Sequence, residues 1–166
     1  MKKESASKGR YAFALLRIAI GLIFLWAFFD KLLGLGFATA SDKSWILGNS
    51  PTSGFLSNAV HGPFKLFYNY LAGNPVVDWL FMLGLLLIGL SLVLGIFVNI
   101  ACYSGALLMF LMWSALLPPA NHPFLDDHII YLLALIGLSR IESGRTLGLG
   151  KWWTSLSFIK KYKLLQ

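Results

Sequence analysis

The stretch VVDWLFMLGLLLIGLSLVLGIF, residues 76–97, decides the fold of this chain. Apart from Asp78 near its start it carries no charge, and it is long enough to cross a bilayer, which takes about 20 residues of α-helix. Pro75 suits the first turn of such a helix, while Asp78 and Trp79 suit the membrane boundary. The stretch therefore predicts a transmembrane helix entered through Pro75.

Three further apolar runs lie on either side of this helix. They cover residues 11–35, 100–117 and 126–141. Asn99 predicts a tight turn, so the 76–97 run and the run after it should form an antiparallel hairpin. The last run is slightly short and would depend on its flanking residues to reach both surfaces. We predict an all-α membrane protein, an antiparallel four-transmembrane-helix bundle that forms one domain over residues 1–166.

Composition and charge agree with a membrane protein. Of the 166 residues, 57% are hydrophobic and 13% are charged, against about 25% charged in ordinary soluble domains. The net charge of +7 does not indicate nucleic-acid binding, because the basic residues gather at the chain ends and not on one soluble face. This bias predicts that both termini are cytoplasmic in a multi-pass protein of the cell membrane.

A cleaved signal peptide is the competing interpretation of the first run. The triplet Ala38-Thr39-Ala40 resembles a small-residue cleavage site. The run is too long for a signal peptide, however, and it contains Arg17 and Asp30. We expect it to remain in the protein as a spanning helix.

Two segments outside the spans carry predictions of their own. Residues 36–75 are rich in Gly, Pro, Ser and Asn, and predict a long structured outer loop. Within it, residues 54–71 should form one or two short interfacial helices broken at Gly62-Pro63. Residues 147–166 mix aromatic side chains with lysines and predict a C-terminal interfacial helix on the inner surface.

Ionisable residues within a span are costly in lipid, so each is a candidate for function or for pairing. Arg17 lies two turns into the first run, where it either reaches the headgroups or pairs internally, for example with Glu142. Asp30 lies four residues after Trp26, on the same helix face, and Lys31 follows it. Since Lys31 places a positive charge on the predicted outer side, it should have a partner there.

The sequence Asp126-Asp127-His128 opens the fourth run on the same outer side. Acidic residues in a first helical turn complement the helix dipole and cap free N–H groups, which is one explanation for the aspartates. Two aspartates followed by a histidine, with Asp30 and Lys31 expected nearby, also suit a proton-transfer or polar-headgroup site at the membrane boundary.

The sequence contains little that indicates a metal site or another kind of redox site. The histidine spacings match no zinc signature, and only His128 lies near a span, so we predict neither a metal site nor a bis-histidine haem. Cys102 is the one cysteine, which excludes a dithiol relay within the chain. We find no iron–sulfur motif and no flavin or nucleotide fingerprint.

Eight short motifs follow one another along nearly the whole chain. They are LRIAIGLIFLWAFFDK at 16–31, GLGFAT at 34–39, SPTSGFL at 50–56, GPF at 62–64, AGNP at 72–75, DWLFMLG at 78–84, DHIIY at 127–131 and LGLG at 147–150. In this order they resemble the DoxX/DoxD membrane proteins, and specifically the DoxD-like branch. The resemblance implies a four-helix membrane fold.

The resemblance also implies an activity. In that family a DoxD-like membrane subunit works with a second, smaller subunit to convert two thiosulfates to tetrathionate, with the electrons passing to membrane quinone. Carboxylate and imidazole would then manage the protons, and Lys31 would attract the anionic donor. The candidate catalytic residues are Asp30, Lys31, Asp127 and His128, and the candidate quinone-binding residues are Arg17 and Trp26. The expected partners are the lipid bilayer, a second subunit or further copies of the chain, and a small anionic substrate.

Family membership alone does not establish an enzyme. Many DoxX proteins carry no assigned activity, and some are linked to membrane-associated redox-stress complexes. A non-enzymatic membrane anchor or assembly subunit is therefore the alternative prediction. A solute carrier is less well supported, because the sequence lacks the paired, interrupted spans of such proteins.

Overall fold

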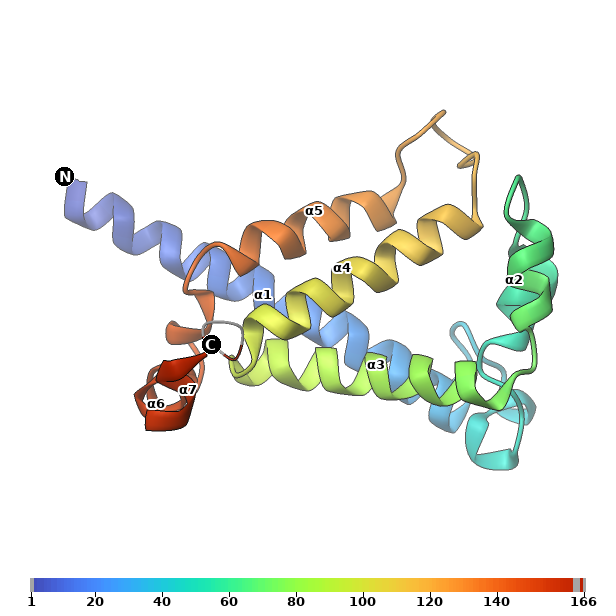
Figure 1. Cartoon of the computed structure of the whole chain (residues 1–166), viewed down its shortest axis with the longest axis horizontal. Coiled ribbons are helices and arrows are strands. Elements are labelled where there is room, and N and C mark those ends of the chain that lie inside the picture. The colour runs from blue at the N-terminus through green and yellow to red at the C-terminus, as the bar shows by residue number, and fades with distance from the viewer. Residues whose placement is uncertain (1, 163–164, 166) are drawn as a thin grey trace.

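The computed structural model describes residues 2–162 and 165, and the regular elements in this part of the chain are all helices (Figure 1). The long ones are α1 (Lys2–Leu33), α3 (Pro75–Leu94), α4 (Val98–Ala115) and α5 (Asp127–Ser139). They correspond to the four apolar runs, and each runs opposite to the one before it (Figure 1).

Three of these helices are long and apolar enough to cross a membrane: residues Gly9–Leu33 of α1, α3 and α4. The expected fourth span is not confirmed. With 13 residues, α5 is about 20 Å long, against about 30 Å of hydrocarbon. It is short because Asp126 caps its start and the backbone leaves the helix at Arg140. The architecture is compatible with a multi-pass membrane protein.

The predicted hairpin of α3 and α4 is present, but its turn lies earlier than Asn99. The N–H of Gly95, which has a φ of 76°, donates to the carbonyl of Ser91 at 2.9 Å and ends α3. Phe97, with a φ of 51°, precedes α4, and Asn99 lies in its first turn. A left-handed backbone costs glycine little, which explains why the chain turns at Gly95 and not at Asn99.

The helices pack in pairs: α1 lies along α3, α5 lies along α4, and α3 contacts α4. One apolar core joins all four, and it includes Ile20, Phe24, Met82, Leu85, Ile88, Leu92, Cys102, Met109, Leu135 and Leu138. Many large apolar side chains on the outer faces remain exposed, among them Leu22, Leu80, Leu87, Leu107 and Leu133. So much exposed apolar surface suits a lipid environment better than water.

The chain between α1 and α3 forms short helices, as predicted for the 54–71 region. They are η1 (Ser41–Lys43), η2 (Trp45–Leu47), η3 (Phe55–Ala59) and α2 (Lys65–Leu71). The break between η3 and α2 includes Gly62-Pro63, which confirms that part of the prediction. We call the end of the molecule formed by residues 34–74 and 116–126 the loop end.

The opposite end, which we call the tail end, contains residues 95–97 and 140–162. After η4 (Ser143–Arg145), the chain forms α6 (Gly150–Ser155) and α7 (Ser157–Lys161) in place of one continuous helix over 147–166. The extended backbone of Leu156 separates the two. Residues 163, 164 and 166 of the predicted helix lie outside the described residues.

Candidate functional site

Arg17 in α1 is fully buried inside the protein. Its guanidinium donates to the carbonyl oxygens of Leu92 at 2.6 Å, Thr146 at 3.2 Å and Leu147 at 2.9 Å. Leu92 lies in the last turn of α3, where carbonyls lack partners within the helix. Arg17 therefore connects α1 to the end of α3 and to the tail end.

The predicted partner of Arg17, Glu142, pairs with Arg145 instead, at 2.6 Å on the surface. Gly95 lies so close to the guanidinium that a Cβ there would be 2.5 Å from Nη1 of Arg17. The arginine is thus an internal partner of backbone carbonyls and not of a carboxylate. These contacts connect backbone segments, and a role of Arg17 in quinone binding stays a prediction.

Asp30 is buried near the end of α1 and accepts hydrogen bonds from the backbone N–H groups of Phe37 at 3.2 Å and Ala38 at 3.0 Å. Trp26, one turn earlier, packs edge-on against the ring of Phe37, with centroids 4.9 Å apart. The two residues share a face, as predicted, and together they hold the turn that follows α1.

Lys31 has no ion pair among the described residues. Its Nζ lies 5.8 Å from the centroid of the Phe81 ring, over an aromatic face that attracts a cation. The predicted outer partner is therefore absent from the described residues, and the charge of Lys31 remains at the loop end.

The residues that open α5 form a carboxylate–imidazole pair. Asp126 accepts a hydrogen bond from the N–H of Ile129 at 3.2 Å through Oδ1, and its Oδ2 lies 2.7 Å from Nδ1 of His128. The two side chains are 19% and 22% exposed. Asp127 is exposed in the first turn and has no hydrogen bond to the described residues. The partner of His128 is therefore Asp126 and not Asp127.

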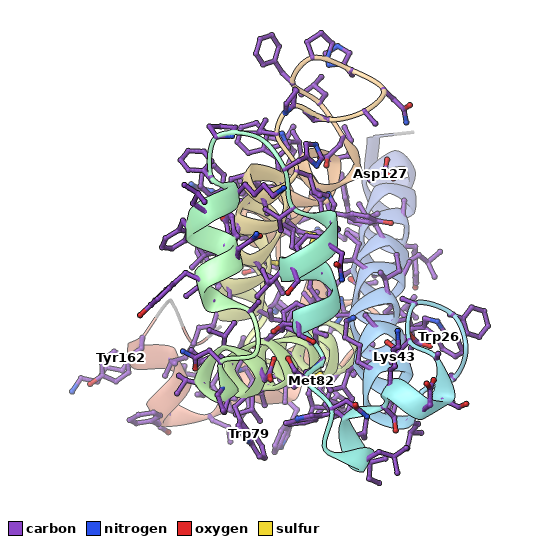
Figure 2. The ribbon with its side chains drawn as sticks, turned by 90° about the vertical axis from the view of Figure 1, so that its right-hand side faces the viewer. Trp26, Lys43, Trp79, Met82, Asp127 and Tyr162 are labelled. Carbon is purple, nitrogen blue, oxygen red and sulfur yellow. The ribbon has the colours of Figure 1, made fainter. Side chains whose placement is uncertain are left out.

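The expected cluster of Asp30 and Lys31 with Asp127 and His128 does not form. The end of α1 and the start of α5 lie far apart at the loop end (Figure 1), and Figure 2 shows Asp127 well separated from Trp26 on α1. The prediction assumed that the first and last helices meet there. Because α1 lies along α3 and α5 along α4, the two groups of residues are separated.

Sequence analysis missed the contacts of Asp78, a further buried carboxylate at the loop end. Asp78 is 6% exposed and accepts hydrogen bonds from the hydroxyls of Ser50 at 2.8 Å and Thr52 at 2.5 Å. The cluster ties the loop end to the first turn of α3. The sequence does carry a signal for this residue: a charge at the edge of an apolar run, the criterion that also selected Asp30.

Removing the Asp78 carboxylate should detach this part of the loop end from α3. Asp78→Ala deletes two hydrogen bonds to a charged acceptor and leaves two hydroxyls without an acceptor, so we expect it to lower the free energy of unfolding by about 2–4 kcal/mol. Thermal unfolding in detergent measures the loss. Asp42→Ala, at an exposed carboxylate on the same end, is the control. Equal losses in the two variants would show that the Asp78 bonds add nothing.

His61 connects two parts of the loop end. Its Nδ1 lies 3.1 Å from the carbonyl oxygen of Ala59, and its Nε2 lies 3.1 Å from that of Pro118. Both neighbours are acceptors, so both contacts are hydrogen bonds only when both ring nitrogens carry protons. The carbonyls of Ala59 and then Pro118 accordingly raise the pKa of His61.

The His61 contact should weaken as the pH rises. Because the folded pKa lies above that of the unfolded chain, the stabilisation is fully present below about pH 6.5 and is lost as the pH rises through the folded pKa. Limited proteolysis of the loop end between pH 5 and 9 should show faster cleavage at the higher pH. His61→Gln should remove this dependence, whereas His122→Gln should retain it. A pH dependence that survives in His61→Gln would assign the effect to another group.

Comparisons of the chain with protein-family models, curated proteins and solved structures find no match.

Proposed function

We propose that this chain is the membrane subunit of a quinone-linked oxidoreductase of the thiosulfate dehydrogenase type, with both termini on the cytoplasmic side of the cell membrane. In the overall reaction, two thiosulfates form a new S–S bond to give tetrathionate and release two electrons. One quinone takes up these electrons and two protons to become the quinol. The observation that supports the proposal best is the Asp126–His128 pair at the start of α5.

The pair has the properties of a proton donor for quinone reduction. Asp126 occupies Nδ1 of His128, whereas Nε2 has no hydrogen bond to the described residues. An imidazole changes charge near neutral pH, and a neighbouring carboxylate orients it. Ile130 and Leu133, in the next turns of α5, are 60% and 58% exposed. The pair thus lies beside exposed apolar surface of α5, which suits the ring of a lipid-soluble quinone.

Lys31 and Asp30 have supporting roles in the proposed activity. Lys31 carries a charge without an ion pair among the described residues and would attract the anionic donor to the loop end. Asp30 positions the turn after α1. The one cysteine, Cys102, is buried, so the sulfur chemistry would take place with a second subunit bound to this chain.

The test is thiosulfate-dependent reduction of a short-chain quinone by the purified chain, alone and with candidate second subunits. We expect His128→Gln to lower the rate by at least about tenfold, since general acid catalysis contributes about that much or more. Asp126→Asn keeps the helix cap but removes the carboxylate charge, so it should lower the rate with little change in melting temperature. Asp42→Asn should retain full activity.

Two results would contradict the proposal. One is the absence of turnover in every combination of subunits. The other is a rate for His128→Gln equal to that of the unmodified chain.

A second candidate function is a non-enzymatic assembly subunit of a redox-stress complex in the membrane. Its support is that the buried charged residues Arg17, Asp30 and Asp78 are all engaged in hydrogen bonds that hold the fold. Under this alternative, the chain would co-purify with its partners equally well with and without His128→Gln, and no combination would reduce quinone.

A further inference from the structure

A cleft of about 880 Å³ opens at the tail end, between the start of α1 and the chain that follows α5. It lies at the opposite end of the molecule from the Asp126–His128 pair and is independent of the proposed activity. Its lining includes Arg10, Tyr11, Ser143, Arg145, Thr146 and Lys151.

The charge of the cleft is positive. The lining contains one carboxylate, that of Glu142, and three cations, Arg10, Arg145 and Lys151. Glu142 pairs with Arg145 at 2.6 Å, whereas neither Arg10 nor Lys151 has an ion pair among the described residues. Two cations on different segments are therefore available to one anion bound between them.

Ser143 supplies an independent sign of a ligand. It lines the cleft and is 4% exposed, and its Oγ is buried without a hydrogen-bond partner in the described part of the chain. Buried hydroxyls are normally hydrogen-bonded, and leaving one unpaired is unfavourable. A turn of the Ser143 side chain toward the cleft would let this hydroxyl donate to an acceptor oxygen of a bound molecule.

Hydrogen bonds from Arg17 hold one wall of the cleft. Thr146 and Leu147 line it, and their carbonyl oxygens accept the hydrogen bonds of the buried Arg17. This wall is therefore held in place by the rest of the protein, which lowers the entropic cost of binding against it.

The position of the cleft indicates the chemical class of its ligand. Its lining includes Tyr11, where the first apolar run begins, so in the predicted topology it lies close to the boundary of the hydrocarbon. The apolar side chains of Phe13 and Leu147 at the cleft are 47% and 51% exposed. The ligand should thus combine an anion that several cations can share with an apolar body. We propose that the cleft binds the phosphate-bearing headgroup of an anionic phospholipid.

The experiment is thermal unfolding of the full chain in a neutral maltoside detergent, titrated with phosphatidylglycerol, phosphatidylcholine or inorganic phosphate. We expect phosphatidylglycerol to raise the melting temperature in a saturable manner, because a ligand of the folded state stabilises it. The double variant R10Q/K151Q should lower the apparent affinity by at least about tenfold. The matched control K160Q/K161Q removes two charges from the same end, outside the cleft, and should retain the affinity.

Ser143→Ala separates a ligand contact from a structural one. The variant removes an unpaired hydroxyl, so the melting temperature without lipid should not fall. The affinity for phosphatidylglycerol should nevertheless fall by about three- to tenfold, as expected for one hydrogen bond to a charged acceptor.

Three results would overturn the proposal. Equal losses of affinity in the two double variants would mean attraction by net charge alone. Equal stabilisation by phosphatidylcholine would remove the requirement for an anion. Stabilisation by inorganic phosphate equal to that by phosphatidylglycerol would identify a soluble anion, and not a lipid, as the occupant.

Discussion

Replacing Arg17 with methionine is expected to lower the free energy of unfolding by at least about 3 kcal/mol. Methionine fills similar space, but it leaves the buried carbonyl of Leu92 and the partly buried carbonyls of Thr146 and Leu147 without their donor. An unpaired buried group costs about 1–3 kcal/mol. Removing a buried charge also returns its desolvation cost, which offsets part of the loss. The net change should still be a loss of stability, because the carbonyls stay in place without a donor.

Thermal and chemical unfolding in detergent measure this effect. Arg17→Lys should give an intermediate loss, because an ammonium group cannot reproduce the fork of the guanidinium. Arg140→Gln, at an exposed arginine of the tail end, is the control for charge. A stability of Arg17→Met equal to that of the control would show that the three hydrogen bonds contribute nothing net.

Gly62→Ala is expected to have the second large effect, a loss of more than about 3 kcal/mol. Gly62 has a φ of 76°, and a Cβ there would lie 1.6 Å from the carbonyl oxygen of Leu117. This oxygen is backbone, so the chain before Pro118 would have to move. The movement would also break the neighbouring contact of His61 with Pro118.

Gly73 provides a control for backbone strain. Its φ is 73°, nearly that of Gly62, yet a Cβ there would meet no atom within 4 Å. Gly73→Ala should therefore cost only about 1–2 kcal/mol, the penalty of a left-handed alanine. Thermal unfolding of both variants isolates the steric part as their difference. Equal losses would mean that the Leu117 carbonyl moves away freely.

The helices were largely predictable because apolar runs of this length have few alternatives to membrane-spanning helices. The run at 76–97 gave α3, and proline and glycine in the loop end gave the break between η3 and α2. The ends were less predictable. The turn after α3 follows the glycine at 95, a local signal that the prediction of a turn at Asn99 did not use. The end of α5 at Arg140 has no such glycine at the cap to mark it.

The candidate site was predictable by residue type but not by partner. Charges within apolar runs selected Arg17 and Asp30 as candidates for function or pairing, and both are buried and hydrogen-bonded. Their partners are backbone groups, however, and backbone groups carry no signal in the sequence. The supposed meeting of Asp30 with Asp127 required the packing order of the helices, which apolar runs alone do not specify.

The hydrogen bonds of Arg17 also bear on the order in which the protein can be made. Leu92 is synthesised 75 residues after Arg17, and Leu147 130 residues after it. Until the ribosome has reached residue 146, the first helix holds an arginine with at most one of its three partners, and such a residue is costly in lipid. Insertion of this helix should therefore stay reversible, or remain under the protection of the insertion machinery, until synthesis is almost complete. We expect the first helix of a chain truncated before residue 146 to remain incompletely inserted.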